Sequence, residues 1–331
     1  MRYLIPLFAI AAVAAPQLTV KSLPLPGATG PVSLDYLACD RAKGKVWIPA
    51  GGTGSVDVLD KATGALKRIE GFATVEKEAH GAKRMMGPSS ATIGAGFVYV
   101  GNRANSAVCA VDAEKLVLGA CLELPSSPDG LQYVAATREV WVTTPRDLSL
   151  TILDASSPAK LSIKTKVALD GEPEGYGIDE KRGLFFTNLE DKNKTLAVDV
   201  KTRKVVSTWD AGCGAEGPRG LALDPVRGWL FVACTDGLNQ LDLAHDGARL
   251  ARLDTGAGVD NIDYLEAKQL VFVAAGKAEK LTVAHAEAGK LTVVATAPIG
   301  SGARTVVVDS AGAGYVVDPA KGQILLVSAP P

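Results

Sequence analysis

The sequence predicts an all-β fold, a single seven-bladed β-propeller. Three observations predict it: short apolar runs separated by turn residues, an aromatic residue that recurs at a nearly constant interval, and an aspartate that recurs in the same phase. The interval is 41 to 52 residues, close to the length of a unit of four short strands. One such unit exposes apolar faces that it cannot cover alone, and neighbouring units in a closed ring cover them.

The repeat is clearest between Gly217 and Leu243. Strands are expected at 221–223, 229–233 and 239–243, with turn residues such as Asp224, Pro225 and Gly237 between them. The aromatic residue of the second strand recurs as Trp47, Tyr99, Trp141, Phe186, Phe231, Phe272 and Tyr315. The aspartate that closes the third strand recurs as Asp60, Asp112, Asp154, Asp199 and Asp242. The seven aromatic positions predict seven blades.

The blades are expected to follow one another along the chain. Their predicted ranges are 31–72, 87–127, 128–171, 172–216, 217–258, 259–302 and 303 onward. The last blade has only three strands of its own, at 305–309, 314–317 and 324–327. The missing strand is available at 18–23, so the N-terminal strand is expected to close the last blade and to remove a free sheet edge.

The N-terminus has a different character. Arg2 precedes an apolar run over 4–14, which ends in the small residues Ala12, Val13 and Ala14. This pattern indicates a secretory signal peptide over residues 1–14, followed by a single propeller domain over 15–331. The run is too short for a comfortable transmembrane span. We therefore expect a periplasmic or secreted protein with no transmembrane segment in the mature chain.

Five cysteines fit an oxidising compartment. Cys109 and Cys121 are expected on neighbouring strands of the second blade, nearly opposite one another. Cys213, in the connection into the fifth blade, and Cys234, at the end of that blade's second strand, are expected at the same end of the ring. Both pairs can meet at disulfide distance. The alternative is that all five are buried thiols; Cys39 is left over in either case.

The formal net charge is −1. There is no basic excess to attract a phosphate backbone, so we expect no nucleic acid partner. We expect a monomer.

One step of the repeat is too long. The excess lies in the segment from Ala73 to Met86, which has no strand pattern and connects the first blade to the second. Such connections lie where the channel opens, so this segment is a candidate lid; the alternative is a solvated insertion without a role. It contains His80, the one histidine of three that is expected to reach the mouth of the channel.

Superposing the repeats gives one position per blade just before the inner strand. These positions are Asp35, Ser89, Asp129, Glu174, Arg219, Asp260 and Arg304, with Glu172 and Asn261 beside them. Two guanidinium groups suit a carboxylate or phosphate group. The candidate ligand-binding residues are therefore Arg219, Arg304, Glu174, Asp129, Asp260, Asn261 and His80. The alternative is that these arginines and acids neutralise one another as structural ion pairs.

The same ring contains a candidate metal site. Glu174, Asp260 and Asn261 supply oxygen atoms of the kind that a hard cation such as calcium prefers. No firm cofactor follows beyond this divalent cation. The sequence has no nucleophile-elbow motif, so catalytic residues stay unassigned.

The run 217–225, followed by Leu230, Phe231, Val232 and Ala233, resembles the YVTN-type repeat of seven-bladed propellers, and so does the run 196–206. On these residues the chain is similar to the YncE-like group of secreted bacterial propellers, over nearly its whole mature length. The first, sixth and seventh blades depart from the repeat pattern. The resemblance implies a periplasmic or surface protein whose relatives include binding proteins and a lactonase group.

Three functions are therefore open. The first is a non-enzymatic, exported binding protein that uses the polar mouth of the channel for a small anionic or polar ligand. The second is a metal-dependent, lactonase-like hydrolase, in which a calcium-like cation polarises a carbonyl group. The third is a scaffold for an unknown protein partner.

Overall fold

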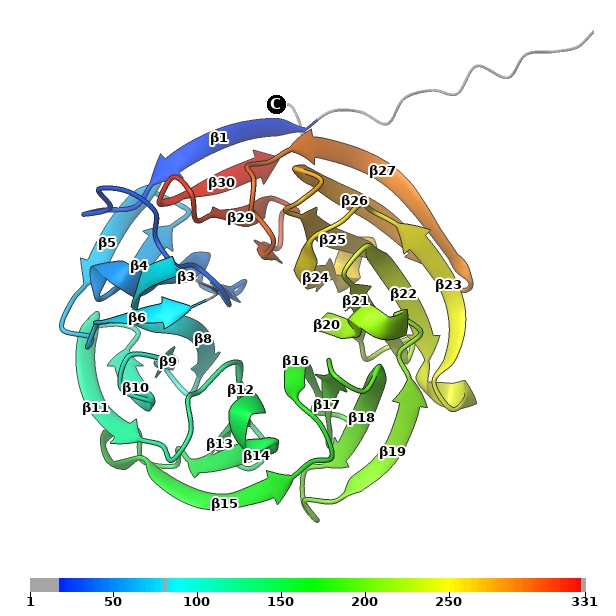
Figure 1. The fold of residues 1–331 in the computed structure, drawn as a ribbon, viewed down its shortest axis with the longest axis horizontal. Coiled ribbons are helices and arrows are strands. Elements are labelled where there is room, and N and C mark those ends of the chain that lie inside the picture. Colours follow the sequence, from blue (N-terminus) through cyan, green and yellow to red (C-terminus); the bar gives the residue numbers. More distant parts are fainter. Residues whose placement is uncertain (1–17, 80–81, 329–331) are drawn as a thin grey trace, which may run out of the picture.

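The computed structural model describes residues 18–79 and 82–328, which form a ring of seven four-stranded antiparallel sheets (Figure 1). In the first six blades, strand order from the channel to the outer edge follows the chain. The first blade consists of β2 (Ala38–Asp40), β3 (Lys45–Ala50), β4 (Ser55–Asp60) and β5 (Ala65–Ile69). The second consists of β8 (Pro88–Gly94), β9 (Phe97–Asn102), β10 (Ala107–Asp112) and β11 (Val117–Glu123). The third consists of β12 (Leu131–Val134), β13 (Glu139–Thr144), β14 (Ser149–Asp154) and β15 (Ser162–Ala168). The fourth blade consists of β16 (Pro173–Asp179), β17 (Leu184–Leu189), β18 (Lys194–Asp199) and β19 (Val205–Asp210). The fifth consists of β20 (Pro218–Asp224), β21 (Trp229–Cys234), β22 (Gly237–Asp242) and β23 (Ala248–Asp254). The sixth consists of β24 (Val259–Leu265), β25 (Leu270–Ala275), β26 (Lys280–Glu287) and β27 (Lys290–Pro298). The predicted fold class is confirmed.

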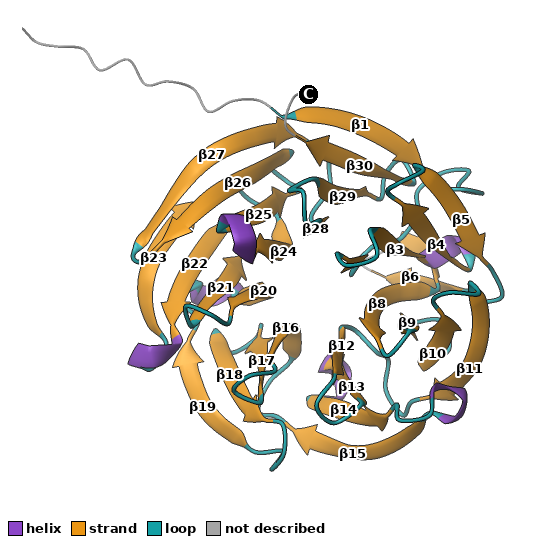
Figure 2. Cartoon of the chain, turned by 180° about the vertical axis from the view of Figure 1, so that it is seen from behind, coloured by secondary structure: helices purple, strands orange, loops and turns teal. Residues whose placement is uncertain are grey.

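The seventh blade joins the two ends of the described chain. Its inner strands are β28 (Val306–Val308), β29 (Gly314–Asp318) and β30 (Gln323–Ser328), and its outer strand is β1 (Thr19–Pro24). β1 runs antiparallel to β30, from the pair Thr19–Ser328 to the pair Pro24–Gln323. Figures 1 and 2 show this closure, with β1 outside β30. The predicted closure by the N-terminal strand is confirmed.

The recurring aromatic residues form the core between blades. All seven lie in the second strands and are buried. Three of them pack against an aromatic residue of the next blade: between ring centroids, Tyr99 lies 5.8 Å from Tyr133, Trp141 lies 4.8 Å from Phe185, and Phe231 lies 4.7 Å from Tyr264. One face of each sheet therefore covers the next, which explains why the repeat keeps a large apolar residue here.

The recurring aspartates hold the turns that lead to the outer strands. The Asp112 carboxylate accepts hydrogen bonds from the backbone N–H groups of Glu114 and Lys115, at 3.0 and 2.9 Å. Asp199 does the same for Lys201 and Thr202. Aspartate recurs in the sequence because a short side chain with an acceptor oxygen can close such a turn.

The segment from Ala73 to Met86 contains two strands, β6 (Val75–Ala79) and β7 (Ala82–Met86), which form a separate hairpin. The expectation that this segment has no strands is wrong. Its charged residues hide the strand signal, although one of them joins the strands: Lys83 Nζ lies 3.2 Å from Glu76 Oε2. Figure 1 shows β6 directed toward the channel. His80 lies outside the described residues.

Both predicted cysteine pairs are disulfides. Cys109 on β10 lies directly opposite Cys121 on β11, and Cys213 is bonded to Cys234 at the end of β21. Cys39 is the unpaired cysteine, and burial raises the pKa of its thiol to about 12. Within the ranges given above, no helix is long and apolar enough to cross a membrane. The predicted signal peptide, residues 1–14, lies outside the described residues.

Candidate functional site at the mouth of the channel

A cavity of about 1020 Å³ lies where the chain enters the inner strands. Each of the seven blades contributes at least one charged side chain to its lining. We select one from each blade and call this set the mouth ring: Asp35, Arg103, Asp129, Glu174, Arg219, Asp260 and Arg304. Lys77 and Met86 of the β6–β7 hairpin also line the cavity, so the hairpin forms part of its wall.

Six residues of the mouth ring are at positions expected from the repeat, and Arg103 is the exception. Ser89, the expected residue of the second blade, is buried, and its hydroxyl donates to Gly101 O at 3.4 Å. Arg103 follows β9 directly, and its backbone N–H donates to Gly87 O at 3.0 Å. The end of the second strand therefore lies beside the start of the first, and the long arginine side chain reaches the ring from there.

Arg103 joins two buried carboxylates. Its Nη2 lies 2.8 Å from Asp35 Oδ2 and also forms an ion pair with Asp129. Asp35 is 6% exposed and Asp129 is 8% exposed, so both charges need this partner. The second oxygen of Asp35, Oδ1, is buried and has no hydrogen-bond partner in the described part of the chain. An unsatisfied buried acceptor of this kind is uncommon and favours a ligand that donates a hydrogen bond.

The other two arginines of the mouth ring are also engaged. Arg219 forms an ion pair with Glu190, and Arg304 Nε lies 3.1 Å from Asp260 Oδ2. The guanidinium groups that were expected to receive an anion therefore already face carboxylates. Structural ion pairing accounts for part of the ring, as the alternative interpretation of the sequence expected.

Two tyrosines pack together beside the mouth ring. Tyr36, from the first blade, donates its hydroxyl hydrogen to Glu174 Oε1 at 3.0 Å, and its ring centroid lies 5.3 Å from that of Tyr176 on β16. Tyr36 is only 2% exposed. A side chain at Gly130 would collide with the Tyr176 ring, so this glycine makes room for it. The two rings therefore occupy space between the first and fourth blades.

Three carboxyl groups of the mouth ring, those of Asp260, Asp129 and Glu174, have raised pKa values. Burial is the largest cause of each shift. It raises the pKa of Asp260 to about 6 even though Arg304 opposes the shift. Burial also raises the pKa of Asp129, although Arg103 opposes this shift. The pKa of Glu174 lies well above its ordinary value, because repulsion from Asp129, Asp260 and Asp35 adds to the effect of burial.

A second cavity, of about 440 Å³, lies on the other side of the tyrosines. Its lining includes Asn261, whose Oδ1 accepts the backbone N–H of Ile262 at 2.9 Å. The three candidate metal ligands are thus divided: Glu174 and Asp260 line the mouth cavity, and Asn261 lines the smaller one. Among the residues that the structure describes, no group of three or more His, Cys, Asp or Glu side chains is arranged to hold a metal ion.

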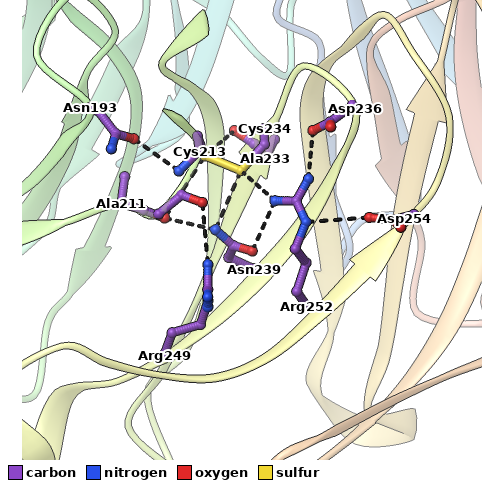
Figure 3. Close-up of polar contacts among 11 residues, drawn as sticks. Asn193, Ala211, Cys213, Ala233, Cys234, Asp236, Asn239, Arg249, Arg252 and Asp254 are labelled. Atoms are coloured by element: carbon purple, nitrogen blue, oxygen red, sulfur yellow. Dashed lines mark hydrogen bonds and ion pairs between the residues drawn. A yellow bond between two sulfur atoms is a disulfide. The ribbon is translucent and has the colours of Figure 1, made fainter. Parts of the chain in front are cut away.

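The Cys213–Cys234 disulfide supports the wall of the mouth cavity (Figure 3). Asn239 Nδ2 contacts the Cys234 sulfur at 3.4 Å, and Arg252 joins this group to Asp236 at 2.7 Å between Nη2 and Oδ1. Glu216 and Asp236, which line the cavity, lie three and two residues from the bonded cysteines. The disulfide therefore restrains the segment that leads to Arg219.

Replacing both Cys213 and Cys234 by Ala is expected to lower the free energy of unfolding by about 3 kcal/mol, because the unfolded chain gains loop entropy. Denaturant unfolding measures this loss. Removing Cys109 and Cys121 in the same way is the matched control, with a loss of similar size. Hydrogen exchange of residues 213–219 is expected to accelerate only in the first variant. Equal exchange in both variants would contradict the role of this disulfide at the mouth.

The fold and the site define a class of protein: a seven-bladed β-propeller with a charged cavity at one mouth of its channel. No model of a protein family matches this chain, and no curated protein matches it. Solved structures share its fold. Virginiamycin B lyase from Staphylococcus aureus is 14% identical, with a TM-score of 0.71, covering 95% of this chain and 100% of that one.

Two further structures are similar. One is hydrazine synthase from Kuenenia stuttgartiensis, 12% identical, with a TM-score of 0.75 and coverage of 91% of this chain and 97% of that one. The other belongs to a mitotic checkpoint complex, 13% identical, with a TM-score of 0.75 and coverage of 99% of both chains. At such identities the likeness shows the fold alone. The resemblance to YncE-like propellers is not confirmed by these findings and stays a prediction.

Proposed function

We propose that this protein is an exported, non-enzymatic binding protein that holds a small polar ligand in the mouth cavity. The observation that carries the proposal is the mouth ring itself: charged side chains from all seven blades line one cavity. Ligand sites in proteins are typically concave and contain a few convergent polar groups. The rigid ring of sheets beneath would keep these groups in place.

The state of the charged groups favours a ligand that donates hydrogen bonds over an anion. Arg103, Arg219 and Arg304 all face carboxylates, so an anion would have to displace an ion pair. The buried Asp35 Oδ1, in contrast, lacks a donor within the described residues. Export is supported by the two disulfides, which suit the periplasm or the extracellular space, and by the predicted signal peptide.

A thermal-unfolding screen with sugars, amino acids, amines and carboxylates tests the proposal. A ligand at 100 times its Kd stabilises the folded protein by about 2.7 kcal/mol, which raises the melting temperature measurably. The shift is expected to shrink or disappear in Ser127→Trp, because Ser127 lines the mouth cavity and an indole there would project into it and occupy part of the space for a ligand.

Gln132→Leu is the matched control, since Gln132 lines the smaller cavity beyond the tyrosines. We expect this variant to keep the full ligand-induced shift. Shifts that survive in Ser127→Trp but vanish in Gln132→Leu would move the binding site to the opposite end of the channel and contradict the proposal.

A further inference from the structure

Negative charge is in excess in the mouth cavity. Eight carboxyl groups and six cationic side chains line it, and four of the carboxyl groups belong to the mouth ring: Asp35, Asp129, Glu174 and Asp260. The cations among them are Arg103 and Arg304, because Arg219 is paired with Glu190. Two guanidinium groups cannot neutralise four ionised carboxylates. In a buried place this imbalance is costly, and it favours either bound protons or a bound cation.

One buried oxygen marks where a cation could be received. Asp35 is more than nine-tenths buried and lines the cavity, and its Oδ2 faces Arg103 at 2.8 Å. Its Oδ1 has no donor among the described residues. A carboxylate oxygen only accepts hydrogen bonds, so the missing partner must be a donor.

A second carboxylate of the mouth ring also lacks a donor. Asp129 forms its ion pair with Arg103 through Oδ1, and its Oδ2 is buried without a partner among the described residues. Glu174, from the neighbouring blade, accepts from Tyr36 through Oε1 at 3.0 Å. Burial and repulsion from Asp129 and Asp260 raise the pKa of Glu174 well above its ordinary value, so Glu174 favours its protonated form.

We propose that the ligand of the mouth cavity carries an ammonium group, which binds among these carboxylates in exchange for a proton of Glu174. The inference rests on the proposed function, because it names the chemical class of ligand for the same cavity. An ammonium group supplies up to three donors and one positive charge, which are the two things that these carboxylates lack.

The exchange makes binding depend on pH. Glu174 is faced by the carboxyl groups of Asp35, Asp129 and Asp260, by the Tyr36 hydroxyl, and by the cations Arg103 and Arg304. The carboxyl groups and burial raise its pKa. A cation placed among them has the opposite effect and releases the proton. Affinity for an amine should therefore rise with pH as long as the amine itself stays protonated.

Calorimetric titration with three four-carbon compounds tests the inference: putrescine, 1,4-butanediol and succinate, which are dicationic, neutral and dianionic. Putrescine is expected to bind wild-type protein and to fail in Ser127→Trp. Between pH 5.5 and 7.5 its affinity should rise by up to tenfold per pH unit, the limit for release of one proton. Heats measured in buffers of different ionisation enthalpy give the number of protons released.

Glu174→Gln isolates the exchange, because the amide keeps the size of the side chain but does not titrate. This variant should bind putrescine at pH 5.5 about as well as wild type and should release no proton on binding. Its affinity for putrescine should not rise between pH 5.5 and pH 7.5. Glu172→Gln is the control: Glu172 also lines the cavity, two residues earlier, and the wild-type proton release should persist there.

The outcomes separate the two proposals. If butanediol or succinate binds, is blocked by Ser127→Trp, and putrescine does not bind, the mouth is a ligand site but the ammonium inference fails. Binding of putrescine with no proton release and no change with pH overturns the exchange. If nothing in this set or in the wider thermal screen binds in a way that Ser127→Trp blocks, the proposed function fails as well.

Discussion

A chain that begins at Leu25, and so lacks β1, is expected to lose roughly 3–5 kcal/mol of folding free energy and to self-associate. β1 pairs with β30 over six residues, from Thr19 to Pro24, and each backbone hydrogen bond in such a ladder contributes about 0.5–1.5 kcal/mol. Without β1, the backbone groups of β30 form an open sheet edge, which can pair with another molecule. Thermal unfolding and light scattering at several protein concentrations measure the two effects.

The side chains of β1 are the control for its backbone. Most of them are exposed, so replacing Thr19, Lys21 and Ser22 together by Ala should cost less than about 1 kcal/mol. A synthetic peptide of residues 18–24 should bind the shortened chain and restore its melting temperature, because a strand added in trans can cover the same edge. Wild-type stability in the shortened chain would show that closure by β1 does not hold the ring.

The ring could be predicted from the sequence because its determinants are local and repeated. The aromatic of each second strand must be buried, and the aspartate of each third strand must close a turn, so both recur at a fixed interval. The closing strand followed from counting: a blade with three strands leaves an edge, and a spare strand was available at 18–23. Neither argument depends on how side chains meet across the channel.

The mouth ring could be predicted only in part, for the same reason. Superposing the repeats locates the start of each inner strand and so finds Asp129, Glu174 and Asp260. Arg103 and Glu190 belong to a second register, the residue that directly follows the second strand of a blade. That register also lies beside the inner strands, as the hydrogen bond from Glu190 N to Glu172 O at 3.0 Å shows. Superposing it as well would have found both residues.

Contacts across the channel have no signal in the repeat. Tyr36 and Glu174 are 138 residues apart and belong to the first and fourth blades, yet they are hydrogen bonded. The pair forms because two unrelated side chains of suitable length meet on the axis. The same holds for Asn261, which was expected at the mouth: the strand directs its side chain to the smaller cavity, where its own neighbour, Ile262, donates to it.

Glu139→Ala is expected to lower the free energy of unfolding by roughly 3–5 kcal/mol, because it leaves the Arg203 guanidinium, whose side chain is only 20% exposed, without its buried partner. Glu139 begins β13 and has no exposed surface. Its carboxylate accepts hydrogen bonds from Arg203 of the fourth blade at 2.6 and 2.7 Å, and from Trp141 Nε1 at 3.1 Å. The Arg203 guanidinium also lies 5.0 Å from the centroid of the Trp141 ring. Removing the carboxylate therefore breaks a contact that joins two blades, and denaturant unfolding measures the loss.

Two further variants, and the pH dependence of stability, distinguish the contribution of burial from that of charge. Lys164 Nζ also contacts Glu139, at 2.8 Å, but its side chain is half exposed, so Lys164→Ala should cost less than about 1 kcal/mol. Burial raises the pKa of Glu139, yet the hydrogen bonds from Lys164, Thr137, Trp141 and Arg203 outweigh it and lower the pKa overall. A lowered pKa gives stability that is present above the unfolded-state pKa and is lost as the pH falls through the folded-state pKa. The difference in the free energy of unfolding between wild type and Glu139→Gln should therefore have its full size at pH 7 and become smaller at acidic pH. A difference that does not change with pH would mean that the shape of the side chain, and not its charge, stabilises this contact.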